Sequence, residues 1–249
     1  SVLGQSYAHY ELLVIDDGSS NSIHSSYCNA LIKEYADPRI AYELKPNAGL
    51  SATRNYGIEK SAGEYIAFLD QDDVWRSAKL SAQIDAFQQN SGTMLVCSTG
   101  VSIGNCAKRL AAGEDAHIPT GIVKRTFSQM LKKNIVIASS VMFRRSLHDV
   151  TPGSNREFFV CPDYELFLRY AQFTDFYFIN EPLVEIRWHE QNTTKRRLKL
   201  ELELVQALAA APLPRLLDRL VYLFRIVLSL LKIFYYTLPF RPRPEIGSK

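Results

Sequence analysis

Short apolar segments that end in polar turns alternate with helical segments over the first hundred residues of the chain. The apolar runs that predict strands are residues 11–15, 40–44, 65–69 and 94–98. The helices predicted between them span about residues 21–35, 50–60 and 79–89. Strands that alternate with helices in this way are typical of a parallel sheet covered by helices on both faces. The sequence therefore predicts an α/β fold with a mostly parallel sheet.

Composition limits the classes of protein to which the chain can belong. With 249 residues, 47% of them hydrophobic, it can bury one full-sized core. Its net charge of +3, without a basic run interleaved with aromatic residues, gives no sign of nucleic acid binding. The four cysteines lack both metal-ligand spacing and disulfide-scaffold density, so we expect a reducing, cytoplasmic setting. No signal peptide opens the chain and Ser1 stands in place of an initiator methionine, so we expect an N-terminal truncation.

The second hundred residues show a weaker periodicity. Residues 104–120 are rich in glycine, alanine and charge, and we interpret them as a mobile loop. Helices are predicted at 127–132 and 163–172, and strands at 138–143, 176–179 and 183–188, which indicates a mixed second half. The predicted division of the chain is 1–103, 104–198 and a C-terminal helical extension at 199–249.

Residues 213–236 form a strongly apolar segment that charged side chains interrupt. Asp218, Arg219, Arg225 and Lys232 leave no window of about 20 apolar residues, so we do not expect a simple membrane-spanning helix. Polar side chains recur at spacings of three and four at Asp218, Tyr222, Arg225, Ser229 and Lys232. This amphipathic pattern leaves leucine, valine and phenylalanine on the opposite helical face. It is typical of a helix that lies in the plane of a membrane surface, and packing against the protein's own core or against a partner is the alternative.

An acidic cluster, Asp70-Gln71-Asp72-Asp73, follows the strand predicted at 65–69. Open α/β sheets bind ligands at the carboxyl ends of their strands, and the spacing lets Asp70 and Asp72 point into one polar crevice. Their repulsion would be relieved by Mg²⁺ or Mn²⁺, which prefer oxygen ligands and share them with substrate phosphates. The cluster therefore predicts a metal-assisted site for a diphosphate-bearing substrate. A turn that caps the next helix is the alternative.

A second acidic turn, Asp16-Asp17-Gly18-Ser19, follows the strand predicted at 11–15. The carboxyl ends of parallel strands meet at one edge of a sheet, so Asp17 is expected near the first acidic cluster. A carboxylate there can accept hydrogen bonds from a nucleobase N–H or from ribose hydroxyls. The alternative is an Asx-type turn stabilised by the following glycine.

Taken in order, these motifs resemble those of the family 2 glycosyltransferases of the GT-A fold. The resemblance covers about residues 1–195. It rests on SVLGQSY at 1–7, VIDDGS at 14–19, NAGLSATRN at 47–55, GEYIAFLDQDD at 63–73, SSVMFR at 139–144, DYELFLR at 163–169 and RWHE at 187–190. The resemblance implies a Rossmann-like nucleotide-binding sheet with helices on both faces. It also implies that residues 1–103 bind the sugar donor, while residues 104–198 bind the acceptor and carry catalysis.

The resemblance implies roles for four residues on the donor side, Asp17, Asp70, Asp72 and His189, and position adds Arg54. Asp17 would hold the nucleotide base, while Asp70 and Asp72 would lie at the donor diphosphate, with Asp72 as the more direct metal ligand. Arg54 lies in a predicted helix near this crevice and would meet a phosphate, with a surface salt bridge as its alternative. His189 lies in an Arg-x-His element and would contact the metal or the diphosphate. The expected cofactor is Mn²⁺ or Mg²⁺.

By the resemblance, Asp163 would be the catalytic base, in a helix whose first turn contains Pro162. A carboxylate that only stabilises the start of this helix is the alternative. Direct displacement at the anomeric carbon needs a carboxylate to take the acceptor hydroxyl's proton, while a metal supports the departing nucleoside diphosphate. The implied activity is inverting transfer of a hexosyl or N-acetylhexosaminyl group from a nucleoside-diphosphate sugar, preferentially UDP-linked. The acceptor would be a saccharide or a lipid-linked glycan of the cell surface. We expect the enzyme at the inner face of the plasma membrane.

Two other functions stay open. Asp70-x-Asp72 after an apolar strand also resembles the nucleophile motif of haloacid-dehalogenase-like phosphatases, in which Asp70 would attack phosphorus. The non-enzyme alternative is a catalytically inactive nucleotide-sugar-binding module attached to a membrane. Phosphate release from simple esters would identify the phosphatase, and donor binding without turnover would identify the binding module.

Overall fold

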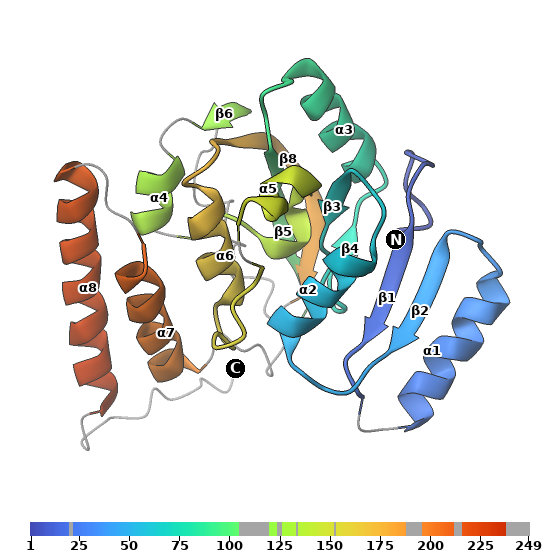
Figure 1. The fold of residues 1–249 in the computed structure, drawn as a ribbon, viewed down its shortest axis with the longest axis horizontal. Coiled ribbons are helices and arrows are strands. Elements are labelled where there is room, and N and C mark those ends of the chain that lie inside the picture. The colour runs from blue at the N-terminus through green and yellow to red at the C-terminus, as the bar shows by residue number, and fades with distance from the viewer. Residues whose placement is uncertain are drawn as a thin grey trace.

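The computed structural model describes residues 1–19, 22–104, 120–123, 126–132, 134–151, 153–187, 196–211 and 216–237. Within these residues the chain forms a small two-stranded sheet, a larger six-stranded sheet and the helices that pack around them (Figure 1). The α/β class that the alternating pattern predicts is confirmed, and so is a helix near the C-terminus.

The first half of the chain alternates between strands and helices as the sequence predicts. Its elements are β1 (Leu12–Asp16), α1 (Ser22–Tyr35), β2 (Ile40–Leu44), α2 (Leu50–Lys60), β3 (Tyr65–Ala67), β4 (Val74–Trp75), α3 (Lys79–Gln89) and β5 (Leu95–Ile103). The bounds of β2, α2 and α3 match those expected. The sequence does not predict β4, because two residues carry no periodicity and their strand conformation depends on pairing with a distant strand, β8 (Phe176–Arg187).

The second half differs more from its prediction. Its other elements are β6 (Gly121–Val123), α4 (Thr126–Lys132), a 3-10 turn (Ala138–Ser140), β7 (Met142–Arg144), α5 (Arg145–Asp149), α6 (Pro162–Tyr170), α7 (Arg197–Ala209) and α8 (Leu216–Thr237). The strand expected at 138–143 is a 3-10 turn followed by β7, and the strands expected at 176–179 and 183–188 are the single strand β8. Apart from its two end residues, the loop expected at 104–120 lies outside the described residues.

Strand pairing is mixed. β1 and β2 form a parallel pair of their own, with Leu12 opposite Ile40. In the larger sheet the order is β3-β7-β5-β8-β4, and β6 pairs with β8. Among the strand pairs that the structure describes there, only β5 and β8 run parallel, joined by the long crossover that parallel strands require, and the other four pairs are antiparallel. The sheet is therefore less parallel than the sequence predicts, because the strands of the second half run back between those of the first.

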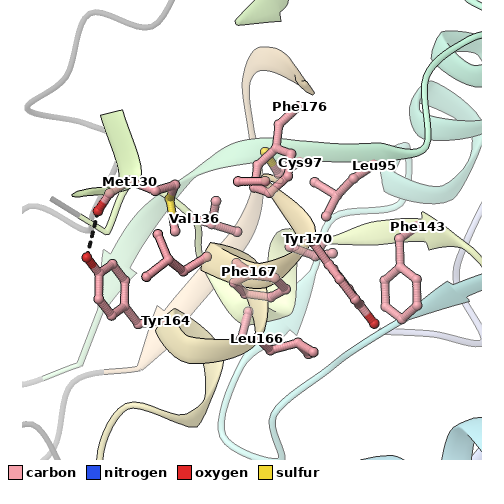
Figure 2. Close-up of a cluster of buried hydrophobic side chains, with 14 of the residues drawn as sticks. Leu95, Cys97, Met130, Val136, Phe143, Tyr164, Leu166, Phe167, Tyr170 and Phe176 are labelled. Carbon is pink, nitrogen blue, oxygen red and sulfur yellow. Dashed lines mark hydrogen bonds between the residues drawn. The ribbon is translucent and has the colours of Figure 1, made fainter. Parts of the chain in front are cut away.

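Helices cover both faces of the larger sheet. Successive residues of β5 point to opposite faces, so that Leu95 and Cys97 contact the cluster around α6 while Val96 contacts the cluster under α3. Figure 2 shows the first cluster, in which Tyr164 of α6 donates a hydrogen bond to the Met130 carbonyl oxygen at 2.8 Å. Helix α6 is therefore fixed from both the sheet and α4, which holds its N-terminal end in a defined place.

Helices α7 and α8 pack on this core at the side of the molecule away from β1 and β2 (Figure 1). Ala207 and Leu208 of α7 belong to the buried cluster, and Val221 and Ile226 of α8 pack against it. The predicted C-terminal extension is therefore continuous with the core of the larger sheet.

The polar face of α8 points into the protein. Asp218 is buried and accepts a hydrogen bond from Ser128 of α4. Ser229 and Lys232 donate to the carboxylate of Glu201 on α7, at 2.7 and 2.8 Å. The helix thus packs on the protein's own core, through these polar contacts together with Val221 and Ile226.

The outer face of α8 is apolar and exposed. Its exposed large side chains include Leu220, Phe224, Leu231 and Phe234, and Phe224 is 64% exposed. By length and composition alone the helix could cross a membrane. Asp218 and Arg219 lie at the helix start, which leaves only Arg225 and Lys232 charged in its body. That the helix is not a simple membrane-spanning one stays a prediction.

Candidate active site

The turn after β1 is organised by the carboxylate of Asp17. Its Oδ1 accepts hydrogen bonds from the Lys45 ammonium and, at 2.9 Å, from the Ala48 backbone N–H. Its Oδ2 accepts one from the Gly49 N–H at 2.8 Å. Lys45 also reaches the Thr53 hydroxyl oxygen at 3.3 Å, so the turn is joined to the start of α2.

These contacts keep Asp17 ionised. Burial acts to raise the pKa of Asp17, but the hydrogen bonds from Lys45, Ala48, Thr53 and Gly49 together outweigh it and lower the pKa below its usual value. The carboxylate therefore carries its charge at neutral pH, at the carboxyl end of β1 where the sequence places a ligand site.

Gly18 allows the same turn to close. Its φ of +70° lies in the left-handed region, and a Cβ there would lie 2.6 Å from the backbone nitrogen of Asn47. Asn47 in turn donates from its side-chain amide to the Asp17 carbonyl oxygen at 2.8 Å. Only glycine fits this close approach of two loops.

Arg54 of α2 joins two carboxylates that are far apart in the sequence. One guanidinium nitrogen donates to Asp163, and the other donates to Asp70 Oδ1 at 2.9 Å. The guanidinium carbon also lies 5.1 Å from the centre of the Phe68 ring. Because its side chain is only 7% exposed, Arg54 is a buried member of the cluster and makes no surface salt bridge.

Ser139 holds the acidic turn at residues 70–73 in place through hydrogen bonds. Its hydroxyl donates to Asp73 Oδ2 at 2.6 Å and accepts from the Asp70 backbone N–H at 3.1 Å. Its carbonyl oxygen accepts from the Trp75 indole N–H at 2.7 Å. Ser139 is fully buried, so the 3-10 turn that carries it fixes the acidic turn to the sheet.

Asp73 is the most deeply embedded carboxylate of this turn. Besides Ser139, it accepts a hydrogen bond from the Arg187 backbone N–H at 3.0 Å. Burial is the main cause that raises the pKa of Asp73 to about 6, since these hydrogen bonds only partly offset it and Asp70 and Asp72 add repulsion. Its contacts are those of a residue that shapes the turn.

Asp72 lies beside the end of β8. Its carbonyl oxygen accepts from the Arg187 Nε at 3.2 Å, which ties the acidic turn to the last residue of β8, the arginine of the predicted Arg-x-His element. His189 itself lies outside the described residues.

Asp163 lies in the first turn of α6. Pro162 precedes it at the helix start, as the sequence predicts. A carboxylate in this position is stabilised by the positive end of the helix dipole. The Asp163 side chain is 26% exposed, so it combines a fixed location with access from solvent.

The acidic turn offers carboxylate oxygens, the ligand type that Mg²⁺ and Mn²⁺ prefer. Throughout the described part of the chain, no group of three or more His, Cys, Asp and Glu side chains is arranged to hold a metal ion. An ion held by Asp70 and Asp72 would therefore have to complete its coordination with water and substrate phosphates, as Mg²⁺ commonly does.

The structure thus brings Arg54, Asp70 and Asp163 into direct contact and joins Asp17 to them through α2. Sequence reasoning gave no role to Lys45 or Ser139, both of which hold predicted site residues in place. Ser139 lies in a motif that supports the family resemblance, and this was the available signal. For Lys45 the only signal in the sequence was its position directly after the strand predicted at 40–44.

Two bacterial glycosyltransferases are similar in sequence to part of the chain. The putative teichuronic acid biosynthesis glycosyltransferase TuaG of Bacillus subtilis is 29% identical over 154 residues, which cover 58% of this chain and 54% of TuaG. The UDP-Glc:alpha-D-GlcNAc-diphosphoundecaprenol beta-1,3-glucosyltransferase WfgD of Escherichia coli is 39% identical over 92 residues, which cover 36% of this chain and 34% of WfgD. The matched segments therefore span about half or less of these relatives.

Two solved structures share the fold. TarS of S. aureus in complex with UDP has a TM-score of 0.67 at 12% identity and covers 95% of this chain and 66% of the TarS chain. The mannosyltransferase PcManGT of Pyrobaculum calidifontis, in complex with GDP-Man and Mn²⁺, has a TM-score of 0.60 at 16% identity, covering 96% and 70%. The fold is thus the GT-A fold predicted from the motifs.

The model of the family described as glycosyl transferase family 2 matches residues 1–151 of the chain. This range includes the Asp17 turn, Arg54 and the acidic turn from Asp70 to Asp73. The match leaves the phosphatase interpretation of the acidic turn without support. The chain belongs to glycosyl transferase family 2.

Proposed function

We propose that the chain transfers a hexosyl or N-acetylhexosaminyl group from a nucleoside-diphosphate sugar to a saccharide or lipid-linked acceptor, with inversion at the anomeric carbon. The observation that carries this proposal is the ion pair of Arg54 with both Asp70 and Asp163. It places a partly exposed carboxylate beside the acidic turn where the donor diphosphate would bind. Inverting transfer requires these two elements to be close together.

In the proposed reaction, Asp163 accepts the proton of the acceptor hydroxyl as the oxygen forms its bond to the anomeric carbon. The bond between that carbon and the diphosphate oxygen breaks at the same time, so the nucleoside diphosphate leaves from the opposite face. Arg54 holds the Asp163 carboxylate in one orientation, which favours a productive approach of the acceptor.

Asp72 and Asp70 would hold the divalent metal, Mn²⁺ or Mg²⁺. When bound, the metal would stabilise the negative charge that develops on the departing diphosphate. The donor phosphates would supply further ligands, in keeping with the two carboxylates that this turn contributes. PcManGT, with the same fold, is described in complex with Mn²⁺.

A UDP-linked donor is the preferred choice. WfgD is named as a UDP-Glc-dependent enzyme, and TarS is described with UDP and with UDP-GlcNAc. Asp17 would serve the nucleotide side of the site by orienting the turn from Lys45 to Gly49, which leads into α2.

Calorimetric titration of UDP in the presence of Mn²⁺ tests the donor site. We expect binding that needs the metal and that Asp72→Asn abolishes; metal-independent binding that survives this change would contradict the site. Asp163→Asn should keep UDP affinity and lose turnover of the sugar donor. Wild-type protein that binds donor but never turns it over would favour the inactive binding module.

The outer face of α8 supports a membrane-associated role. Asp218, Ser229 and Lys232 have their hydrogen-bond partners inside the protein, and the large side chains exposed on the opposite face are apolar. A shallow groove of about 420 Å³ on this face is lined by Leu220, Phe224 and the basic Lys132 and Arg225. Basic groups beside an apolar surface suit the interface of an anionic bilayer. We propose that this face lies on the cytoplasmic leaflet of the plasma membrane, where a lipid-linked acceptor would be presented.

Co-sedimentation with phosphatidylglycerol-containing vesicles tests this role. Phe224→Glu should reduce vesicle binding at least about tenfold, because a charge would replace an exposed apolar side chain. Phe173→Glu is the matched control, since Phe173 is 54% exposed and lies after α6, remote from α8 in the sequence. Equal vesicle binding by both variants and by the wild type would refute the role.

A further inference from the structure

The segment that leads into α6 is held by a carboxylate from α7. Glu203 Oε2 accepts hydrogen bonds from the backbone N–H groups of Phe159, Val160 and Cys161, at 3.1, 2.8 and 3.0 Å. The Phe159 N–H is shared with Oε1, also at 3.1 Å. Three consecutive N–H groups of a segment without regular structure thus converge on one side chain, two residues before Asp163.

Glu203 depends on these main-chain contacts. Its side chain is only 4% exposed, and a buried carboxylate is costly unless hydrogen bonds compensate it. The Lys199 ammonium lies 3.9 Å away on a side chain that is 46% exposed, so it contributes little. The amides in turn need an acceptor, because buried backbone N–H groups are almost always paired. The carboxylate and the segment therefore hold each other in place.

The same segment is also held from the opposite side by α2. The Ser51 hydroxyl lies 3.4 Å from the Phe158 carbonyl oxygen, and Arg54 pairs with the Asp163 side chain. Arg54 thus fixes where the carboxylate points, whereas Glu203 fixes the backbone from which it extends. Removing either constraint leaves the Asp163 oxygen atoms free to move.

A second buried glutamate on α7 makes different contacts. Glu201 accepts from Ser229 and Lys232, both of which belong to α8. Residues two positions apart point to different sides of a helix, so the two carboxylates contact different neighbours. Glu201 therefore matches Glu203 in charge, burial and helix, but has its described partners outside the candidate active site.

We propose that Glu203 is a positioning residue for the catalytic base, acting through the backbone N–H groups of Phe159, Val160 and Cys161. This inference rests on the proposed function, in which Asp163 takes the acceptor's proton. It adds a residue that lies beyond the part of the chain matched by the family model. It also makes α7 part of the catalytic unit.

Glu203→Gln tests the proposal with little change in shape. Glutamine can place its one acceptor oxygen where Oε2 lies, but its NH₂ group then faces the Phe159 N–H in place of Oε1. The negative charge that strengthens all of these hydrogen bonds is lost as well, so the segment is held less firmly. The assay uses UDP-glucose or UDP-N-acetylglucosamine with Mn²⁺ and measures the UDP that is released when the sugar is transferred to water. In Glu203→Gln the rate of this release should fall about 10- to 100-fold. The affinity for UDP should stay within about twofold, because the donor site is not touched. Hydrogen exchange at residues 159–161 should become faster.

Glu201→Gln is the control for a general loss of stability. It should lower the thermal midpoint about as much as Glu203→Gln, yet leave UDP release within about twofold of the wild type. Equal losses of UDP release in the two variants would overturn the proposal, since they would indicate a merely structural effect. Unchanged hydrogen exchange at residues 159–161 in Glu203→Gln would overturn it as well, and this measurement needs no turnover.

Asp163→Asn separates this proposal from the proposed function. If Asp163→Asn loses UDP release and Glu203→Gln does not, only the positioning role fails. If Asp163→Asn retains full UDP release, the assignment of the base fails and the positioning role fails with it. The double variant should release UDP no more slowly than Asp163→Asn alone, because Glu203 acts through Asp163.

Discussion

The two acidic turns of this protein look alike in sequence and differ in their electrostatics. Each follows a strand of an α/β sheet, at residues 16–19 and 70–73. In the first turn, Lys45 and backbone N–H groups surround Asp17 and lower its pKa. In the second, burial raises the pKa of Asp73 to about 6, while the buried Arg54 pairs with Asp70. The comparison teaches that an acidic motif acquires its properties from the partners that the fold supplies.

The two turns also differ in what they organise. Asp17 orients a neighbouring loop and the start of α2. The second turn is tied to the 3-10 turn through Ser139, to β8 through Arg187 and to α6 through Arg54. We therefore expect changes in the second turn to affect catalysis more than changes in the first.

The largest effect is expected from Arg54→Ala. This change leaves the carboxylates of Asp70 and Asp163 together without their shared cation, and both are partly exposed. We expect the free energy of unfolding to fall by about 2–3 kcal/mol and turnover to fall at least about 100-fold. Urea denaturation and UDP release measure the two effects.

Arg76→Ala is the matched control, because the Arg76–Glu185 pair is exposed. Arg76→Ala should lower the free energy of unfolding by less than about 1 kcal/mol and leave turnover unchanged. If the two arginine variants behave alike, the second turn has no special dependence on its buried cation.

The next largest effect is expected in the first turn, from Gly18→Ala. The left-handed φ and the 2.6 Å approach to the Asn47 nitrogen should together lower the free energy of unfolding by about 2 kcal/mol. Gly92→Ala is the control, since a Cβ added at Gly92 would meet no atom within 4 Å and its φ is not left-handed. Equal denaturation midpoints for the two variants would show that the turn does not need glycine.

Asp73→Asn tests the raised pKa of the second turn. The pKa of Asp73 is about 3.8 in the unfolded chain and about 6 in the native protein. Between these pH values the native protein binds more protons than the unfolded chain. The stability that Asp73 contributes therefore falls as pH rises through this window. The stability of Asp73→Asn relative to the wild type should therefore rise by about 1–2 kcal/mol from pH 4 to pH 7, allowing for partial exposure.

Asp17→Asn should show the opposite trend. The lowered pKa of Asp17 gives stability that is present above pH 4 and is lost as pH falls below it. The free energy of unfolding of Asp17→Asn, relative to that of the wild type, should therefore rise as the pH falls below 4. Parallel pH profiles for the two variants would remove the electrostatic contrast between the turns.

The smallest effect is expected from Lys45→Ala. The loss of one partner of Asp17 should cost about 1 kcal/mol and raise the pKa of Asp17 toward its usual value, because the Ala48 and Gly49 N–H groups still donate. A urea titration measures the first effect and carboxyl NMR titration the second. If Lys45→Ala lowers the free energy of unfolding as much as Arg54→Ala does, the two turns depend equally on a cation.

The sequence by itself determined the local elements and the chemistry at their ends. The strand at 40–44 and the helices at 50–60 and 79–89 have the predicted bounds, because periodicity and the surrounding proline, glycine and asparagine residues act within a few positions. The two acidic turns, the family and the α/β class follow from the same short motifs. The pairing of β4 and the union of 176–187 into one strand did not follow, since both depend on partners far along the chain.

Only the tertiary structure decided how these parts meet. Arg54 could be assigned to a phosphate or to a surface salt bridge, and its contact with Asp70 and Asp163 depends on where the fold places α2, the acidic turn and the start of α6. Glu203 carries no sequence signal at all, because its partners are backbone N–H groups of a distant segment. Helical periodicity gave α8 two faces, but which face points inward depended on Ser128 and Glu201, which belong to other helices. Periodicity predicts the secondary structure that a segment's own residues favour. Hydrogen bonding and burial depend on neighbours that only the folded chain supplies.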